Sequence, residues 1–164
     1  MNGTILNNLL FKTTFSDINL QDDFFLSLKR EYSNFDSWFY KKKNDSCYCS
    51  FDRSNHISSF LYVKEENTHE NYSDISPFFL PKNRLKIGTL KVEKKGWSIG
   101  KKYLEIAHSI AIKNHLDEIY ITFFNGNNSK DELALFLKKW DFHFWGVKGE
   151  EFVFIKNITP VVLL

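Results

Sequence analysis

The sequence is poor in glycine, proline and cysteine, with 7, 3 and 2 of these residues among 164. It contains no Gly/Pro-rich linker, internal repeat or low-complexity tract, which favours one domain. No segment approaches the ~20 apolar residues of a membrane span. The N-terminal residues MNGTILNNLLFKTTF have neither a basic start nor a small-residue cleavage site, so they are a poor signal peptide. We expect a cytoplasmic protein that does not bind membranes.

Neither the net charge nor the cysteines point to a specialised partner. The net charge is +2, which is too small to argue for nucleic acid. We interpret the run Lys41–Lys43 as a solvated face, with a site for an anionic carrier such as RNA as the alternative.

Cys47 and Cys49 lie on one face of a predicted strand. Because no further Cys or His is nearby for a metal site, we interpret them as a reduced structural pair and leave a catalytic or redox role open.

Hydrophobic periodicity predicts one α/β domain. Apolar residues make up 43% and charged residues 26% of the chain, an ordinary globular mixture. The pattern order β-α-α-β-β-β-α-β-α-β-β predicts a mixed, mostly antiparallel sheet of six or seven strands, with helices on both faces. We assign residues 1–158 to this domain and interpret the apolar residues 159–164 as the start of a further region or a strand that packs on a partner. The predicted strands are 9–18, 46–52, 56–66, 84–93, 117–124, 142–148 and 150–158, and the predicted helices are 20–32, 33–43, 99–115 and 130–140, the last capped by Ser129. We expect strands 84–93 and 117–124 to be neighbouring parallel strands that separate after Val92.

The turn between strand 84–93 and the following helix has an unusual composition. Gly96 and Gly100 stand close together there, and lysines flank them on both sides. Glycine permits unusual φ angles and leaves backbone amides uncovered, while a helix start adds free N–H groups and a positive dipole end. The turn therefore predicts an anion site suited to phosphate, although it matches neither the dinucleotide fingerprint nor the P-loop.

From about Phe11 to Ile158 the chain resembles the GCN5-related N-acetyltransferase (GNAT) superfamily. The element order is similar, and residues 95–100, Lys-Gly-Trp-Ser-Ile-Gly, resemble the family motif Q/R-x-x-G-x-G/A. Lys95 stands where Gln or Arg is usual and keeps the charge but not the planar fork. Ser98 stands where the first motif glycine is usual and keeps its backbone N–H. The resemblance implies the acyl-CoA N-acyltransferase fold and acetyl-CoA as co-substrate.

A second family landmark, L-Y-x-K-x-G-F, is similar to FLKKWDF at residues 136–142. Asp141 replaces the glycine, and Lys130 takes the place of a usual asparagine. Leu137 stands where many members have a tyrosine that protonates the departing thiolate, and leucine has no proton to donate. We predict that Leu137 packs in the core along most of its surface, with one edge facing the thioester.

The resemblance implies that acetyl-CoA lies across the end of strand 84–93. Its pantetheine amides would pair with the backbone near Leu90 and Val92, and its pyrophosphate would contact the N–H groups of Trp97 to Lys101. A neutral acceptor amine would then attack the thioester carbonyl directly. The implied cofactor-binding residues are Leu90, Lys91, Val92, Lys95, Gly96, Trp97, Ser98, Ile99, Gly100 and Lys101.

Two residues are candidates for acid–base chemistry in this site. Glu93 ends the motif strand, where a carboxylate could reach an amine directly or through water, and a solvated charge is its alternative role. Tyr120 lies on the next predicted strand, where core packing is the alternative role. No metal site is predicted.

The sequence leaves the acceptor open. Segments 20–43 and 67–83 shape the acceptor pocket in such folds. Lys41–Lys43 lie in the first segment, and acids that would suit a cationic amine lie in or directly before the second, namely Glu65, Glu66, Glu70 and Asp74. The first hypothesis is an N-acetyltransferase that acts on a small-molecule, protein or aminoacyl-tRNA amine. The second is a non-catalytic acyl-CoA-binding or interaction module, and the third is a toxin-like acetyltransferase of aminoacyl-tRNA. We leave homodimer formation open.

Overall fold

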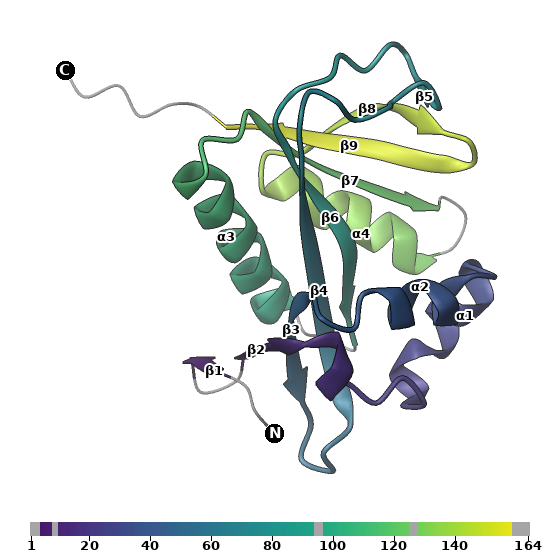
Figure 1. Ribbon diagram of the computed structural model, residues 1–164, viewed down its shortest axis with the longest axis vertical. Coiled ribbons are helices and arrows are strands. Elements are labelled where there is room, and N and C mark those ends of the chain that lie inside the picture. The colour runs from purple at the N-terminus through teal and green to yellow at the C-terminus, as the bar shows by residue number, and fades with distance from the viewer. Residues whose placement is uncertain (1–3, 8–9, 94–96, 125–127, 159–164) are drawn as a thin grey trace. The chain divides into compact units, whose positions relative to one another are not determined.

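The structure is a computed structural model that describes residues 4–7, 10–93, 97–124 and 128–158 (Figure 1). Its Cα trace divides into two compact units. The first unit contains Met1–Tyr62 and Thr89–Ile99, and the second contains Val63–Gly88 and Gly100–Leu164. The assignment of residues 1–158 to one domain stays a prediction.

The described residues form nine strands, which are hydrogen-bonded in the order β1-β2-β3-β4-β6-β7-β9-β8-β5. The strands are β1 (Thr4–Asn7), β2 (Leu10–Thr14), β3 (Ser46–Phe51), β4 (Ile57–Glu66), β5 (Ile75–Ser76), β6 (Arg84–Val92), β7 (Glu118–Phe124), β8 (His143–Lys148) and β9 (Glu151–Asn157). The helices are α1 (Leu26–Glu31), α2 (Phe35–Lys41), α3 (Trp97–Lys113) and α4 (Asn128–Lys139), with short 3-10 helices η1 (Phe15–Asp17) and η2 (Asp23–Phe25).

The predicted fold class, a mixed and mostly antiparallel sheet with helices, is confirmed. The pair β6–β7 is parallel, whereas β1–β2, β2–β3, β3–β4, β5–β8, β7–β9 and β8–β9 are antiparallel. The strand count is higher than the predicted six or seven, because β1 and β5 form in addition to the seven strands predicted. β5 is only two residues long, too short to show the alternation that identifies a strand.

The first unit is built around aromatic rings. Phe15 makes edge-to-face contacts with Phe39, Phe60, Tyr62 and Trp38, with ring centroids 4.8 to 5.8 Å apart. These rings come from η1, α2 and β4, so they join segments that are distant in sequence. The predicted helix 20–32 is divided into η2 and α1, because Asp22 caps η2 by accepting a hydrogen bond from the Phe24 N–H.

In the second unit, β6 and β7 are neighbouring parallel strands, as predicted. Their ladder runs from the Arg84–Glu118 pair to the Ile87–Ile121 pair, while β6 itself continues to Val92. We expected the two strands to separate after Val92, and the pairing ends earlier than that. The strand β9 then pairs with β7 along its whole length, from Asn157 opposite Glu118 to Glu151 opposite Phe124.

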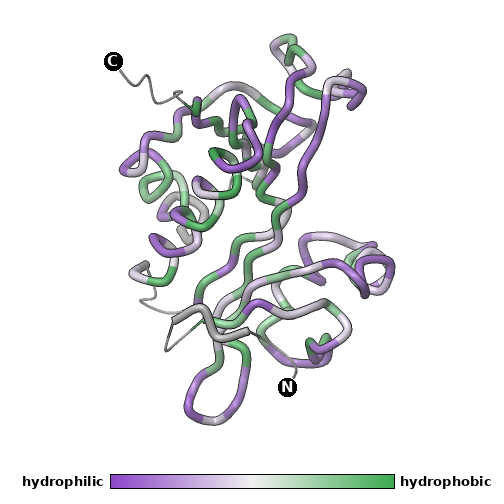
Figure 2. Tube along the Cα trace, turned by 60° about the vertical axis from the view of Figure 1, so that its left-hand side comes forward, coloured by the Kyte–Doolittle hydropathy of each residue, from purple (hydrophilic) through white to green (hydrophobic). Residues whose placement is uncertain are grey.

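The helix α3 connects β6 to β7 and is amphipathic. Tyr103, Ala107 and Ala111 are fully buried at successive turns, and Figure 2 shows hydrophilic and hydrophobic residues alternating along the helix. It begins at Trp97 and ends at Lys113, two residues earlier than predicted at each end. It ends there because His115 adopts a left-handed conformation, with φ of 57°. None of the described helices is long and apolar enough to cross a membrane.

Candidate functional site

The start of α3 has the features of an anion-binding turn. An α-helix leaves its first N–H groups without intrahelical acceptors, and its dipole is positive at that end. In the first turn Ser98 is exposed, Ile99 is half-buried and Gly100 is buried. Lys95 and Gly96, which complete the expected motif, lie outside the described residues. The exposed Ser98 in this turn is compatible with the predicted phosphate contact, which stays a prediction.

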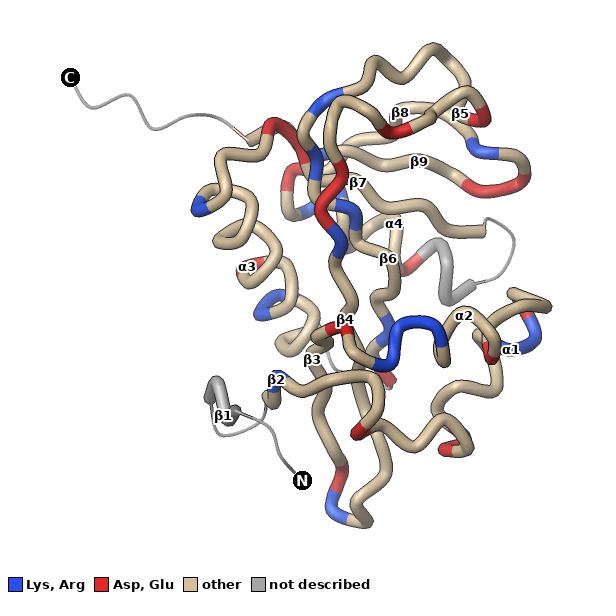
Figure 3. Tube along the Cα trace, in the orientation of Figure 1, with Lys and Arg blue, Asp and Glu red and all other residues tan. Residues whose placement is uncertain are grey.

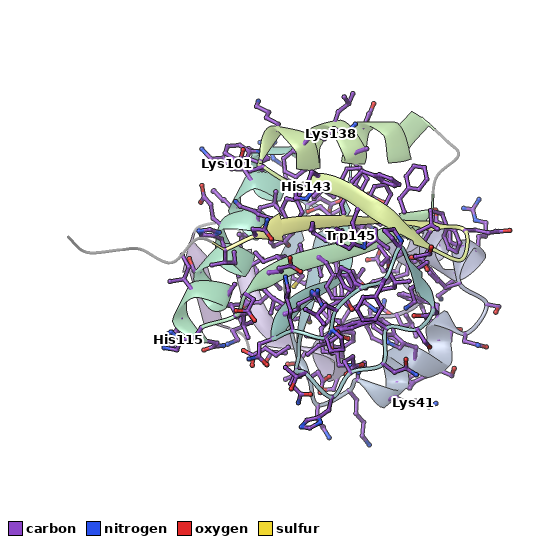
Figure 4. The ribbon with its side chains drawn as sticks, turned by 90° about the horizontal axis from the view of Figure 1, so that it is seen from above. Lys41, Lys101, His115, Lys138, His143 and Trp145 are labelled. Atoms are coloured by element: carbon purple, nitrogen blue, oxygen red, sulfur yellow. The ribbon has the colours of Figure 1, made fainter. Side chains whose placement is uncertain are left out.

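Lys101 follows this turn as an exposed cation (Figure 4). Its Nζ lies 3.9 Å from Glu105 Oε1, one helical turn later. The same Nζ lies 5.2 Å from the ring centroid of Trp140. An exposed ion pair of this kind is weak, so Lys101 keeps its positive charge available next to the helix start.

The end of β6 presents side chains of two kinds. Leu90 and Val92 are half-buried and share one face of the strand. Lys91 points the other way, where its Nζ donates hydrogen bonds to the Phe24 carbonyl and, at 2.8 Å, to Ser27 Oγ. The Lys91 ammonium also lies 4.5 Å from the centroid of the Phe24 ring. Lys91 therefore attaches β6 to η2 and α1, and any role of Lys91 toward a cofactor rests with its backbone.

Glu93 is the first candidate for acid–base chemistry. Its backbone N–H donates to the Ser58 carbonyl at 2.9 Å. Its carboxylate is 42% exposed and lies 4.0 Å from Lys91 Nζ. The side chain is thus accessible at the end of β6, as expected, and its catalytic role stays a prediction.

Tyr120 is the second candidate, and it is only 3% exposed. Its hydroxyl donates to Glu66 Oε1, and the hydroxyl of Tyr72 donates to the same oxygen at 3.1 Å. Burial raises the pKa of Tyr120, and the hydrogen bond and charge of Glu66 raise it further. The phenol therefore stays protonated and its proton is held by Glu66. The catalytic role proposed for Tyr120 is untested, and the geometry shows a core position for its ring.

Lys86 is a residue of this region that the sequence pattern did not single out. It lies on β6 directly opposite Tyr120 in the ladder, and its Nζ is 5.9 Å from the centroid of the Tyr120 ring. Burial lowers the pKa of Lys86, and the positive charge of Lys148 lowers it further. The sequence gives no distinctive signal for Lys86, because it is one of several polar residues that alternate with apolar ones along β6.

The structure agrees with one expectation for the family landmark at residues 136–142 and disagrees with another. Asp141 has a φ of 70°, the left-handed conformation that favours glycine, so the family's glycine position corresponds to a real feature of this turn. Leu137, however, is 0% exposed. The prediction that one edge of Leu137 faces a thioester is not supported, because its whole side chain is committed to packing. The helix α4 begins at Asn128, so Ser129 lies inside its first turn and does not precede the helix as a cap.

The charged residues expected near an acceptor mostly have partners within the chain. Lys64 lies 3.8 Å from Glu70, Lys148 lies 3.8 Å from Asp74, and Asn114 donates to Glu65. In the first unit the basic run at the end of α2 is visible as a continuous blue segment in Figure 3. Lys42 contacts Asp45 at 3.9 Å and the Tyr62 ring at 5.6 Å, whereas Lys41 and Lys43 are exposed. These contacts favour neither a cationic nor an anionic acceptor.

The two cysteines are buried thiols, and the described titratable groups form no cluster that could hold a metal. Cys47 and Cys49 are free and fully buried, and burial raises the pKa of the Cys49 thiol to about 11 and that of Cys47 further. Such thiols are poor nucleophiles at neutral pH. Within the part of the chain that the structure describes, no group of three or more His, Cys, Asp or Glu residues could hold a metal ion.

No protein-family model matches the sequence, and no curated protein matches it. Several solved structures have a similar fold. Naa20 from Chaetomium thermophilum, solved with a bisubstrate analogue, has a TM-score of 0.62 at 13% identity, over 91% of this chain and 86% of that one. A GNAT-family acetyltransferase from Listeria monocytogenes has a TM-score of 0.57 at 11% identity, over 95% and 99%. A chain of the NatC complex, bound to Gag peptide and CoA, has a TM-score of 0.53 at 19% identity, over 92% and 99%. The order of elements, the parallel β6–α3–β7 connection and these similarities lead to one conclusion: the chain has the fold of the GCN5-related N-acetyltransferase superfamily.

Proposed function

We propose that this protein is an N-acetyltransferase that transfers the acetyl group of acetyl-CoA to an amine. The observation that carries the proposal is the passage from β6 into α3, where a strand end is followed by the start of a long helix at which Ser98 is exposed. In the same fold, one solved neighbour holds CoA and another holds a bisubstrate analogue. The free N–H groups of a helix start suit the pyrophosphate of CoA.

The residues of this chain would divide the binding of acetyl-CoA between them. The backbone of Leu90 and Val92 would pair with the pantetheine amides. The amides of the first turn of α3, from Trp97 on, would contact the pyrophosphate, and Lys101 would add a nearby positive charge. Lys91 would act through its backbone alone, because its ammonium is bonded to Phe24 and Ser27.

In the transfer itself, a neutral amine nitrogen would attack the thioester carbonyl carbon. The C–N bond forms, the C–S bond breaks, and CoA leaves as a thiolate. Holding both reactants in one site supplies much of the rate, because a bimolecular step becomes effectively unimolecular. Glu93, exposed at the end of β6, is one candidate to receive the proton from the amine.

A second candidate function is a non-catalytic module that binds acyl-CoA. The feature that favours it is that the resemblance places a leucine, Leu137, where many members of the family have a proton-donating tyrosine. The complete burial of Leu137 counts against that alignment of residues 136–142. An enzyme with this fold would need another group or water for that proton. A binding module would need none.

Calorimetry with acetyl-CoA, followed by a thiol-release assay with a mixed amine library, tests the proposal. Binding with a thiol-release rate that depends on amine concentration is expected for the transferase. Binding with no release above that of buffer would favour the module. Absence of any heat of binding would contradict both functions. An amine that supports release would also identify the acceptor class.

A further inference from the structure

Lys91 is a lysine near the end of β6 whose side chain is mostly buried, with 22% of it exposed. It lies between Leu90 and Val92, the two residues whose backbone would pair with the pantetheine amides. Because side chains alternate along a strand, the Lys91 side chain projects from the face opposite to that of Leu90 and Val92. Burying an ammonium costs free energy unless hydrogen bonds replace the lost water. The contacts of Lys91 therefore indicate what its burial achieves.

The ammonium of Lys91 is bonded to η2 and α1. Its Nζ donates hydrogen bonds to the Phe24 carbonyl oxygen and, at 2.8 Å, to Ser27 Oγ. It also lies 4.5 Å from the centroid of the Phe24 ring, a cation–π contact with a side chain that belongs to the core of the first unit. Hydrogen bonds from a charged donor are among the stronger contacts in proteins. One side chain of β6 is thus fixed to the aromatic core.

The segment that receives this ammonium is itself fixed to β4. Asp22 accepts hydrogen bonds from the Phe24 N–H at 2.9 Å and from the Ile57 N–H at 3.1 Å. Ile57 is the first residue of β4, and the next residue, Ser58, accepts a hydrogen bond from the Glu93 N–H at 2.9 Å. The contacts therefore form a closed ring, which leaves β6 through its lysine side chain and returns directly after the strand, at Glu93. All residues of this ring of contacts belong to the first unit.

The end of β6 needs such support because the strand extends beyond its ladder with β7. In the described residues the ladder ends at the Ile87–Ile121 pair, whereas β6 continues to Val92. A strand segment outside its ladder keeps backbone N–H and C=O groups for a ligand, but it also lacks the hydrogen bonds that fix its position. The contacts of Lys91 supply that constraint from the side chain, and they leave the backbone free.

We propose that Lys91 is a positioning residue for acetyl-CoA, an inference that rests on the cofactor site of the proposed function. Its side chain, bonded to η2 and α1, holds the backbone of Leu90 and Val92 in the position that receives the pantetheine amides. The side chain does not touch the cofactor, and no proton passes through it. Affinity for CoA therefore depends on Ser27, a residue of α1 outside the proposed cofactor site.

Four variants test this role, and calorimetry with CoA measures the affinity of each. Lys91→Met removes the ammonium and keeps much of the length of the side chain. Ser27→Ala removes one acceptor of the ammonium and leaves β6 unchanged, and the double variant shows whether the two residues act together. Lys29→Met is the matched control, because the Lys29 side chain is 24% exposed and lies 3.8 Å from Asp36, but it is on α1 and outside the ring of contacts.

We expect Lys91→Met to weaken CoA binding about tenfold and Ser27→Ala about threefold, within the range of substitutions that act through a network of contacts. The double variant should bind CoA like Lys91→Met, because the Ser27 hydroxyl acts only through the ammonium. Lys29→Met should bind CoA like the wild type. Thermal unfolding without ligand gives the loss of stability in each variant, so that every affinity is measured at a temperature where the variant is folded.

The results that contradict this inference differ from those that contradict the proposed function. If the wild type binds no CoA, both fail together. If it binds CoA but no amine supports thiol release, the transferase fails, and a loss of affinity in Lys91→Met and Ser27→Ala still supports the positioning role.

If the wild type binds CoA and both single variants bind it equally well, only the positioning role is wrong, and Lys91 serves the stability of the fold. If Lys91→Met loses affinity and Ser27→Ala does not, the ammonium contacts the cofactor directly and the inference is also wrong. Ser27→Ala removes only a hydroxyl, so it decides the question even if Lys91→Met does not fold. A threefold loss then supports the role, and wild-type affinity overturns it.

Discussion

Lys86 and Tyr120 face each other across the parallel ladder of β6 and β7, with the Lys86 ammonium 5.9 Å from the tyrosine ring. The hydroxyl group of Tyr120 donates a hydrogen bond to Glu66 Oε1. The carboxylate of Glu66 therefore binds the phenol, while the Lys86 ammonium lies over the aromatic face. A lysine in this position is partly desolvated without an ion pair, which makes it costly to the fold in its charged form.

The first prediction concerns the stability of Lys86→Met as a function of pH. The pKa of Lys86 is lower in the folded chain than in the unfolded chain, so the unfolded state binds more protons between the two values and the wild type gains stability as pH rises through them. Lys86→Met lacks this pH-dependent contribution to the stability. We expect it to be more stable than the wild type at neutral pH, with an advantage that shrinks toward the ordinary pKa of lysine. Urea unfolding at a series of pH values measures this, and a pH-independent difference would contradict it. Lys12→Met, a control at an exposed lysine that also faces a tyrosine across a strand ladder, should show little change at any pH.

The second prediction concerns the anion site at the start of α3. Ser98→Glu places a negative charge on the exposed first turn, where it complements the helix dipole but repels a pyrophosphate. Affinity for CoA should fall at least about tenfold, on the order of 1.4 kcal/mol, while thermal stability is kept or rises. Gly100→Glu is a poorer test, because Gly100 is buried and a glutamate there would disturb packing. Ser109→Glu, on an exposed position of the same helix, is the control. Equal affinities of the two glutamate variants would place the phosphate elsewhere.

The third prediction concerns Asp22, whose side chain is 7% exposed. Burial alone would raise the pKa of Asp22, but the hydrogen bonds from the Phe24 and Ile57 N–H groups and the nearby His56 outweigh it, so the pKa is lowered. The stabilisation is therefore present above the ordinary pKa of aspartate and is lost as pH falls through the lowered value. Asp22→Asn should cost about 1–2 kcal/mol at pH 7, typical of a cap with buried donors, and less in acid. Asp23→Asn, at the exposed next residue, should be within about 0.5 kcal/mol of the wild type in chemical denaturation. Equal midpoints for the two variants would rule out the capping role.

The fourth prediction contrasts two glycines near the β8–β9 hairpin. A Cβ at Gly146 would collide with the Ser76 carbonyl oxygen and lie 2.5 Å from Pro77 Cδ, so the backbone of β5 or β8 would have to move. Gly149 has open space around it but a φ of 57°. We expect Gly146→Ala to cost about 3 kcal/mol or more and Gly149→Ala roughly 1 kcal/mol from backbone strain. Denaturation midpoints decide the order, and a larger loss at Gly149 would contradict the close approach at Gly146.

The sequence by itself determined the succession of elements, and it supplied the prediction of an anion site at the start of α3. Apolar residues at period 2 or 3.6 report on one segment at a time, so the seven longer strands, the helix after residue 96 and the parallel β6–β7 pair could be predicted. The glycines and lysines of residues 95–101, and the glycine-like position of Asp141, are also local features. Each could therefore be recognised within one short stretch of sequence. Element ends were less accurate, as at α3, because the conformation of His115 decides where that helix stops.

Only the tertiary structure decided which side chains meet. Glu66 and Tyr120 are 54 residues apart in the sequence, and nothing in either segment shows that the carboxylate holds the phenol. Leu137 is one of several apolar residues on α4, and only the packed fold encloses it completely. Lys86 reads as an ordinary polar residue of a strand until β7 places Tyr120 opposite it. The physical reason is that periodicity specifies the face on which a side chain lies, whereas its partner, its solvent exposure and its pKa depend on what other segments bring to that face.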